Sequence, residues 1–202
     1  MSPYKLIYFN GRGAGETIRL LFSYGKLEFE DVRIEQDQWP KVKPTTPFGQ
    51  VPVLEYNGKK VNQSTAIERF VAKKVKLAGN NDWEDLEIDS VVDTINDLKQ
   101  KVVPAFFNQD QESKAKAQKE LQKETVPFYL GKFEKLAESN GGFLAAKRLT
   151  WADFHFVGAY SFIEWADGNG LAKYPNLKKL KDVVEGQPGV KEWIAKRPKT
   201  DW

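Results

Sequence analysis

Apolar residues follow two different rhythms along the chain, and the change falls near residue 77. Before it, short apolar runs typical of strands alternate with stretches whose apolar residues recur at helical spacing. Asn57-Gly58 separates two of the runs, and this pair favours the two positive φ angles of a type I′ hairpin turn. The predicted elements are a strand at 5–9, a helix at 16–24, a strand at 29–34, a hairpin at 51–61 and a helix at 64–75. Gly11, Gly13 and Gly15 are expected to form a flexible turn between the first strand and the first helix. This order is β-α-β followed by β-β-α.

The rest of the chain is predicted to be all helical, and it ends with two shorter helices near 176–186 and 189–196. Residues 77–82, Leu-Ala-Gly-Asn-Asn-Asp, are rich in turn formers and are expected to join the two parts. Thr150 and Asp153 have the spacing of a capping box before a strongly apolar helix, and Pro127 is expected to kink a helical stretch over 113–140. The expected domains are a mixed one over residues 1–77 and an all-helical one over residues 83–202.

Composition narrows the class of protein. The 202 residues are 41% hydrophobic and 29% charged, which is ordinary for a globular protein that buries a core. Lys and Arg number 31 against 28 Asp and Glu, without a basic cluster, so neither a nucleic-acid partner nor a membrane is expected. No run approaches the ~20 apolar residues that span a bilayer, and the first residues lack a signal-peptide pattern. A cytoplasmic protein is therefore predicted.

Two residue types that often carry catalysis are scarce. The chain has no Cys, which excludes disulfides, thiolate zinc sites and a cysteine nucleophile. The single His, His155, lies in the apolar helix after Thr150, where we expect a structural role. Mechanisms that need a His base in a triad are therefore set aside. Thiol chemistry would require a sulfur that arrives with a ligand.

Three local features favour a site for a small anionic peptide. Tyr8 ends the first apolar run, residues 48–54 read Phe-Gly-Gln-Val-Pro-Val-Leu, and Gln63-Ser64 stands at the start of an apolar helix. A helix N-terminus presents unpaired amides and partial positive charge, so Ser64 suits a carboxylate, and it equally suits a simple cap. Tyr8 offers a hydroxyl donor because an ordinary tyrosine pKa is near 10, and a packed core tyrosine is the alternative. The residues alone leave these interpretations open.

A longer set of motifs resembles the sigma class of glutathione transferases over essentially the whole chain. The matching segments are Tyr8-Phe9-Asn10-Gly11-Arg12-Gly13, Trp39-Pro40, Lys43, Pro47-Phe48-Gly49-Gln50-Val51-Pro52-Val53-Leu54, Gln63-Ser64, Thr150-Trp151-Ala152-Asp153 and Arg197-Pro198. Any one of them is weak evidence, and their order and spacing carry the match. The resemblance implies an α/β thioredoxin-like N-terminal domain followed by an all-α C-terminal domain.

The resemblance also implies an enzyme that uses glutathione as co-substrate. Tyr8 would be the catalytic residue, donating a hydrogen bond that stabilises the glutathione thiolate for attack on small hydrophobic electrophiles. Candidate electrophiles are halonitroaromatics, aldehydes from lipid oxidation and organic peroxides. The class includes prostaglandin D synthases, so isomerisation of prostaglandin H2 to prostaglandin D2 is a further expectation. The alternative is a ligand-binding or structural relative with little or no catalysis.

The glutathione-binding residues are expected from the same resemblance. They are Tyr8, Trp39, Lys43, Gln50, Val51, Pro52, Gln63 and Ser64, with Asp97 supplied by the partner subunit of a homodimer. The bond before Pro52 is expected to be cis, which leaves the Val51 backbone to pair with the cysteinyl segment. Lys43 offers a point charge for the glycine carboxylate, with an ordinary surface lysine as the alternative. For Asp97 the alternative is a solvated helix face.

One position departs from the class. Many members have Arg where this chain has Ala14, close to the sulfur and the tyrosine. Either the Arg12 guanidinium replaces part of that charge or the thiolate is less stabilised. A vertebrate prostaglandin D synthase holds a divalent cation in an acidic cluster on the first long helix. Asn96 stands where that cluster needs an acid, so no metal site is expected.

The electrophile pocket is the least constrained part of the predicted site. Its expected walls are Phe9, Arg12, Gly13, Ala14, Phe106, Phe156, Tyr160 and Trp202. Aromatic residues at helical spacing are more often core residues than ligand contacts. Phe48 is expected either to insert into the partner subunit as an aromatic key or to pack within its own domain. Dimerisation itself is implied by the resemblance.

Overall fold

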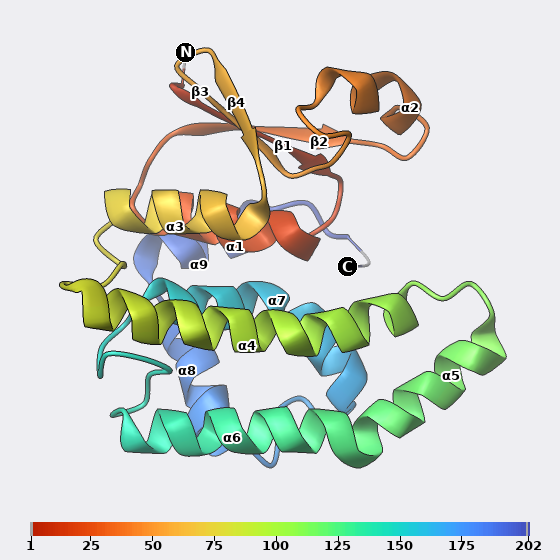
Figure 1. The fold of residues 1–202 in the computed structure, drawn as a ribbon, viewed down its shortest axis with the longest axis vertical. Coiled ribbons are helices and arrows are strands. Elements are labelled where there is room, and N and C mark those ends of the chain that lie inside the picture. The colour runs from red at the N-terminus through yellow and green to blue at the C-terminus, as the bar shows by residue number, and fades with distance from the viewer. Residues whose placement is uncertain (1, 201) are drawn as a thin grey trace. The chain divides into compact units, whose positions relative to one another are not determined.

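The computed structural model describes residues 2–200 and residue 202. Contacts divide the chain into two compact units, one formed by residues 1–77 with 186–202 and the other by residues 78–185. The first unit contains the sheet, and the second is built from helices (Figure 1).

The first unit is built on a four-stranded mixed sheet. Its strands are β1 (Tyr4–Phe9), β2 (Phe29–Ile34), β3 (Val53–Tyr56) and β4 (Lys59–Asn62), in the order β2-β1-β3-β4. β1 and β2 are parallel, whereas β3 is antiparallel to both of its neighbours. A parallel pair needs a crossover connection, and helix α1 (Gly13–Tyr24) supplies it.

Helices cover one face of this sheet. α1 and α3 (Ser64–Lys74) pack side by side, and α9 (Pro188–Lys196) packs against α1 (Figure 1). Tyr4, Leu6 and Tyr8 of β1 are buried on alternate positions, as the period of a strand requires. The short helix α2 (Trp39–Val42) and a 3₁₀ turn, η1 (Lys43–Thr45), connect β2 to β3.

Two backbone predictions in this unit are confirmed. Asn57 and Gly58 have φ angles of 49° and 74°, the positive pair that a type I′ turn requires. The Val51–Pro52 peptide bond is cis. The hairpin turn and the residues before β3 therefore adopt the conformations that the sequence indicates.

The second unit is helical throughout its regular structure. Its elements are α4 (Asp82–Phe106), α5 (Gln111–Glu120), a π turn η2 (Leu121–Thr125), α6 (Val126–Ser139), α7 (Trp151–Asp167) and α8 (Pro175–Glu185). The predicted single stretch over 113–140 is thus interrupted by a wide turn just before Pro127, which has no N–H to continue the ladder. The break falls where the proline predicts it.

Helix α7 forms the centre of the second unit, and its start confirms the predicted capping box. The Thr150 amide donates to Asp153 Oδ2 at 2.7 Å, and the Leu144 amide donates to Oδ1 at 2.9 Å. Asp153 is fully buried, and burial raises its pKa to about 7 against the opposing effect of these hydrogen bonds. This side chain joins the loop before α7 to the helix itself.

The C-terminal segment differs from the expected domain division. Residues 186–202 belong to the first unit rather than to the helical one, because α9 packs on α1. The hydrophobic pattern predicted the helix at 189–196 but contained no information about its packing partner. The first unit is therefore discontinuous in sequence.

The fold class is confirmed as a thioredoxin-like α/β unit followed by an all-helical one. Among the described residues, no helix is long and apolar enough to cross a membrane.

Candidate functional site

Strand register places most of the predicted glutathione residues at one end of the sheet. Ile7 pairs with Val53, and Val53 pairs with Asn62. Tyr8, at the end of β1, therefore lies at the same end as the cis Val51–Pro52 segment before β3 and Gln63-Ser64 after β4. These residues are far apart in the sequence, and sheet pairing alone brings them to one edge.

Tyr8 is buried, and its hydroxyl is held by a backbone amide. The exposed fraction of the residue is 8%, and the Ala14 amide donates to Tyr8 Oη over 3.0 Å. An oxygen that accepts this bond still carries its phenolic proton, which it can donate to another acceptor. The geometry thus suits a hydrogen-bond donor placed beside the first turn of α1.

Three glycines make room for the rings of Tyr8 and Trp202. A Cβ at Gly13 would lie 2.5 Å from Tyr8 Oη, and one at Gly15 would lie 2.7 Å from the ring. A Cβ at Gly11 would lie 2.5 Å from the Trp202 ring. The sequence pattern predicted only a flexible turn here, whereas the structure shows that the backbone must approach two aromatic rings closely.

The pKa of Tyr8 is raised above its ordinary value. Burial is the largest cause, while the Ala14 amide and the positive charge of Arg19 lower the pKa and offset part of this effect. The Arg19 guanidinium carbon lies 5.7 Å from the centre of the Tyr8 ring. Tyr8 is therefore a protonated donor at neutral pH and is not suited to act as a base.

Arg19 belongs to a buried ionic network that the sequence analysis missed. Its Nε donates to Asp31 Oδ1 at 2.9 Å, and its Nη1 donates to the Gly11 carbonyl at 2.6 Å. Glu16 is 3.5 Å from the same guanidinium and also accepts from α9. A lone arginine on the apolar stretch Ile18-Arg19-Leu20 was the available signal, because a buried cation needs partners.

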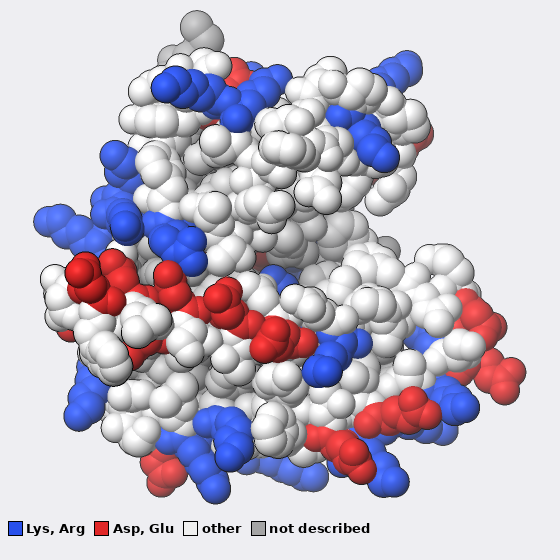
Figure 2. All heavy atoms as spheres, viewed as in Figure 1, with Lys and Arg blue, Asp and Glu red and all other residues white. Residues whose placement is uncertain are grey.

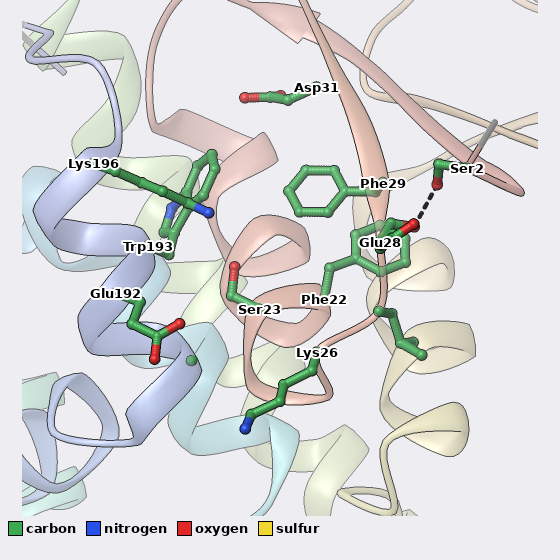
Figure 3. Close-up of a pocket in the computed structure, with 12 residues that line it drawn as sticks. Ser2, Phe22, Ser23, Lys26, Glu28, Phe29, Asp31, Glu192, Trp193 and Lys196 are labelled. Atoms are coloured by element: carbon green, nitrogen blue, oxygen red, sulfur yellow. Dashed lines mark hydrogen bonds between the residues drawn. The ribbon is translucent and has the colours of Figure 1, made fainter.

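Two residues that take part in this network, Asp31 and Trp193, also line a cavity in the first unit. The cavity has a volume of about 570 Å³, and Asp31, Phe29 and Trp193 are among the residues that line it (Figure 3). The Phe29 ring packs at 5.7 Å from the Trp193 ring. The cavity was not expected from the sequence.

The other glutathione-site candidates of the first unit, together with Gln63 and Ser64, differ in exposure and in their local contacts. Gln63 is exposed and has a φ of 77°, an uncommon value for a residue other than glycine, and Ser64 begins α3. Lys43 is exposed, and its Cε lies 3.3 Å from where a Cβ of Gly49 would be. Trp39 begins α2, and its ring packs edge-on against Phe9 at 5.2 Å. Gln50 is exposed next to Val51.

Asp97 lies in the second unit, on α4. It is exposed, and Figure 2 shows acidic side chains gathered along this helix.

Asn96 Oδ1 interacts with His155 Nε2 at 3.0 Å and accepts from Lys99 Nζ at 3.2 Å. His155 is fully buried in this contact, which agrees with the structural role expected for it. In the described part of the chain, no three His, Cys, Asp or Glu residues are arranged to hold a metal ion, and the expected absence of a metal remains a prediction.

The residues predicted to form the electrophile pocket are divided between the two units. Phe9, Arg12, Gly13, Ala14 and Trp202 are in the first unit, and Phe106, Phe156 and Tyr160 are in the second. The Trp202 ring meets the Tyr8 ring edge-on at 6.4 Å, and its carbonyl accepts from the Arg12 amide at 2.6 Å. The cation that faces the Tyr8 ring is Arg19, whereas Arg12 lines a hollow formed with residues 194–200.

In the second unit, the three predicted pocket residues have different surroundings. Phe156 is fully buried, and its ring packs against Phe133 at 6.2 Å, as a core residue does. Phe106 is partly exposed in an aromatic group with Phe162. The Tyr160 hydroxyl donates to Glu164 over 3.3 Å, and burial together with that carboxylate raises the Tyr160 pKa.

Comparison with known proteins shows the family. Residues 4–73 match the glutathione S-transferase N-terminal domain, and residues 96–197 match the C-terminal domain. A glutathione S-transferase of Anopheles gambiae is 45% identical over 202 residues, covering 100% of both chains. The hematopoietic prostaglandin D synthase of Rattus norvegicus is 38% identical and covers 99% of each chain. The structure of prostaglandin synthase D of Nilaparvata lugens matches with a TM-score of 0.92 and 48% identity, over 98% of this chain and 99% of that one.

The fold and these matches define a glutathione-dependent transferase. The chain belongs to the glutathione S-transferase family, and it is an enzyme of that family. Glutathione is the co-substrate that the family uses.

Proposed function

We propose that Tyr8 donates a hydrogen bond to the sulfur of bound glutathione and stabilises it as the thiolate. The observation that carries this proposal is the Tyr8 hydroxyl itself, which accepts from the Ala14 amide and has its proton left to donate. A free thiol has a pKa near 8.5, so a donor that favours the charged form increases the thiolate fraction at pH 7. Each unit of lowering corresponds to about 1.4 kcal/mol of differential stabilisation.

The thiolate then attacks a hydrophobic electrophile. In a substitution on a halonitroaromatic, the carbon–sulfur bond forms, the carbon–halogen bond breaks and halide leaves. In an addition to an unsaturated aldehyde, the sulfur bonds to the β-carbon and a proton from solvent completes the product. The protein supplies orientation and one hydrogen bond, which places catalysis in positioning and electrostatic stabilisation.

Glutathione is held through its two carboxylates and its peptide backbone. Ser64 and the first amides of α3 suit the γ-glutamyl carboxylate, because a helix N-terminus carries partial positive charge. Gln63 precedes the helix with a strained backbone, a feature that commonly accompanies ligand binding. Val51, before cis Pro52, suits the cysteinyl backbone, and exposed Lys43 suits the glycine carboxylate.

We further assign Trp39 and Gln50 to the glutathione backbone and Asp97 to the glutathione amine of the partner subunit. The exposure of Gln50 and Asp97 supports this, because a ligand can reach them. In the first unit, Phe9, Gly13 and Trp202 lie beside Tyr8 and are proposed electrophile contacts. Arg12, Ala14, Phe106, Phe156 and Tyr160 remain predictions as pocket walls.

Isomerisation of prostaglandin H2 to prostaglandin D2 is a second candidate activity. The specific support is that one relative, at 38% identity, is named a hematopoietic prostaglandin D synthase, and that one solved structure, at 48% identity, is named prostaglandin synthase D. The reaction requires the same activated thiolate. Mixing the protein with prostaglandin H2 and glutathione tests it, and prostaglandin D2 must form faster than without protein.

We place the chain in the sigma class as a cytoplasmic homodimer. Phe48 supports dimerisation, because 78% of this large apolar residue is exposed in the single chain. The second unit has a cavity of about 430 Å³ lined by Val91, Phe133 and Leu136, which a partner's phenylalanine suits in size and polarity. A monomer mass for the wild type, or an unchanged dimer mass for Phe48→Ala, would contradict this role.

The pKa of the bound glutathione thiol, measured from thiolate absorbance against pH, tests the main proposal. The chain has no cysteine, so the only thiol that titrates belongs to glutathione. We expect a pKa at least one unit below that of free glutathione. An unshifted pKa with glutathione still bound would mean that Ala14 has cost the activation and would favour a ligand-binding protein.

A further inference from the structure

Arg19 is connected to both the loop and the ring that define the Tyr8 site. Its Nη1 donates to the Gly11 carbonyl at 2.6 Å, and its guanidinium carbon lies 5.7 Å from the Tyr8 ring centre. Gly11 begins the turn that ends at Ala14, whose amide donates to Tyr8 Oη. The position of Arg19 therefore affects both the positive charge near Tyr8 and the Ala14 amide that donates to the Tyr8 hydroxyl.

Two carboxylates pair with Arg19 through different nitrogens. Asp31 Oδ1 accepts from Nε at 2.9 Å, and Glu16 Oε2 lies 3.5 Å from Nη1. Asp31 also accepts from Arg33 Nε at 2.8 Å, and Arg33 in turn donates to Asn10 at 3.2 Å. A buried charge is costly unless it is paired, so the loss of one of these partners is expected to shift the position of the guanidinium.

The other side of Glu16 is held by the C-terminal helix. Glu16 Oε1 accepts from Arg197 Nη1 at 2.5 Å and from Trp193 Nε1 at 3.1 Å. Only 2% of Glu16 is exposed. Its negative charge is thus shared between Arg19 and two further donors, Trp193 in α9 and Arg197 directly after it. The Trp193 ring packs against Phe29 (Figure 3), and its indole N–H donates to Glu16 of α1.

We infer that Arg19 is a positioning residue for Tyr8, and that Arg197 and Trp193 of the C-terminal helix act on the tyrosine through Glu16 and Arg19. The inference rests on the proposed role of Tyr8 as thiolate donor. If Arg197 is removed, Glu16 keeps its charge and draws Arg19 more strongly, because fewer donors remain to satisfy it. Arg19 then moves away from the Gly11 carbonyl and from the Tyr8 ring.

The test compares Arg197→Gln with the matched variant Lys196→Gln. Both remove one cation from the end of α9, but Lys196 is exposed and has no contact with Glu16 among those described. Arg197→Lys restores a charge, and Trp193→Phe removes one donor to Glu16 while keeping an aromatic ring. The measurements are the thiol pKa of bound glutathione, kcat and KM for glutathione with a halonitroaromatic, and the thermal midpoint.

We expect Arg197→Gln to raise the bound thiol pKa by about half a unit, which corresponds to about threefold less thiolate below the pKa. kcat should fall by a similar factor at pH 6.5, with little change in KM. Arg197→Lys should recover part of the shift, Trp193→Phe should show a smaller shift in the same direction, and Lys196→Gln should match the wild type.

Two outcomes would overturn the inference. In one, Arg197→Gln lowers only the thermal midpoint and leaves the thiol pKa unchanged, which is what a purely structural contact predicts. In the other, Lys196→Gln shifts the pKa as much as Arg197→Gln. If Arg197→Gln does not fold, Trp193→Phe decides by the same pKa criterion. The wild-type pKa is measured first, so failure of the proposed function appears there and failure of the inference appears only in the variants.

Discussion

Two buried carboxylates, one in each unit, have very different partners. Glu16 in α1 faces the cations Arg19 and Arg197 together with an indole N–H. Asp153 in α7 accepts from the Leu144 and Thr150 amides and from the Thr150 hydroxyl. The two residues are equally enclosed, with 2% and 0% exposed. Burial alone therefore does not distinguish a carboxylate near the proposed reaction centre from one that shapes the fold.

The difference lies in what each carboxylate holds in place. Asp153 satisfies amides that a helix start and its preceding loop would otherwise leave unpaired, and its effect is on folding. Glu16 pairs with the guanidinium of Arg19, which faces the Tyr8 ring. Because this guanidinium is at the end of a long side chain, its position depends on its partners. Changes at Asp153 should therefore alter stability, and changes around Tyr8 should alter catalysis.

The largest expected effect is on stability, from Asp153→Ala. The variant leaves two buried amides without their acceptor, and we expect it to lower the free energy of unfolding by about 3 kcal/mol. Chemical denaturation measures the change. The control Glu164→Gln, on the exposed side of the same helix, should change it by less than about 0.5 kcal/mol. A marked shift of the glutathione thiol pKa in folded Asp153→Ala would contradict the assignment of Asp153 to folding alone.

Gly13→Ala should reduce catalysis strongly without unfolding the protein. The new methyl group would lie 2.5 Å from Tyr8 Oη, on a residue with a φ of 37°. We expect kcat/KM to fall by more than about tenfold, because small displacements of a catalytic group are costly. The matched control is Gly131→Ala in α6, where a Cβ meets nothing within 4 Å and helix propensity should stabilise slightly. Wild-type activity in Gly13→Ala would show that the Tyr8 hydroxyl is not held as described.

Tyr8→Phe should separate binding from activation. Removing the hydroxyl deletes the proposed bond to sulfur, so we expect conjugation to fall by at least about tenfold while glutathione affinity changes only a few-fold. Steady-state kinetics and a binding titration measure the two quantities. Tyr129→Phe, in α6 of the other unit, is the control for loss of a tyrosine hydroxyl. Full activity of Tyr8→Phe would remove this residue from the mechanism.

The smallest effect is expected in the alkaline pH profile. Because the Tyr8 pKa is raised above its ordinary value of 10.0, the hydroxyl remains mostly protonated at pH values below 10. kcat/KM should therefore rise with pH through the thiolate pKa and then stay level to about pH 9.5. A decline that begins below pH 9, with the protein still folded, would indicate that a different group supplies the proton.

Local patterns predicted the elements and several of their ends. The Asn57-Gly58 turn and the Thr150–Asp153 capping box depend on residues within a few positions of each other, so the sequence contains all of the information they need. The sequence predicts a turn from the glycines at 11, 13 and 15. The structure shows that glycine is needed there because the rings of Tyr8 and Trp202 approach the backbone closely. The sequence can thus identify a glycine-rich turn without showing which side chains require it.

The sequence by itself determined the β-α-β, β-β-α order, the helical second part, the absence of a protein thiol and the motifs of the family. The tertiary structure decided that residues 186–202 join the first unit and that Arg19 lies under Tyr8. It also decided that Glu16 meets Trp193 and Arg197, residues 177 and 181 positions away. Periodicity identifies which face of a helix is buried, whereas the partner on that face is chosen by packing and charge satisfaction across the whole chain.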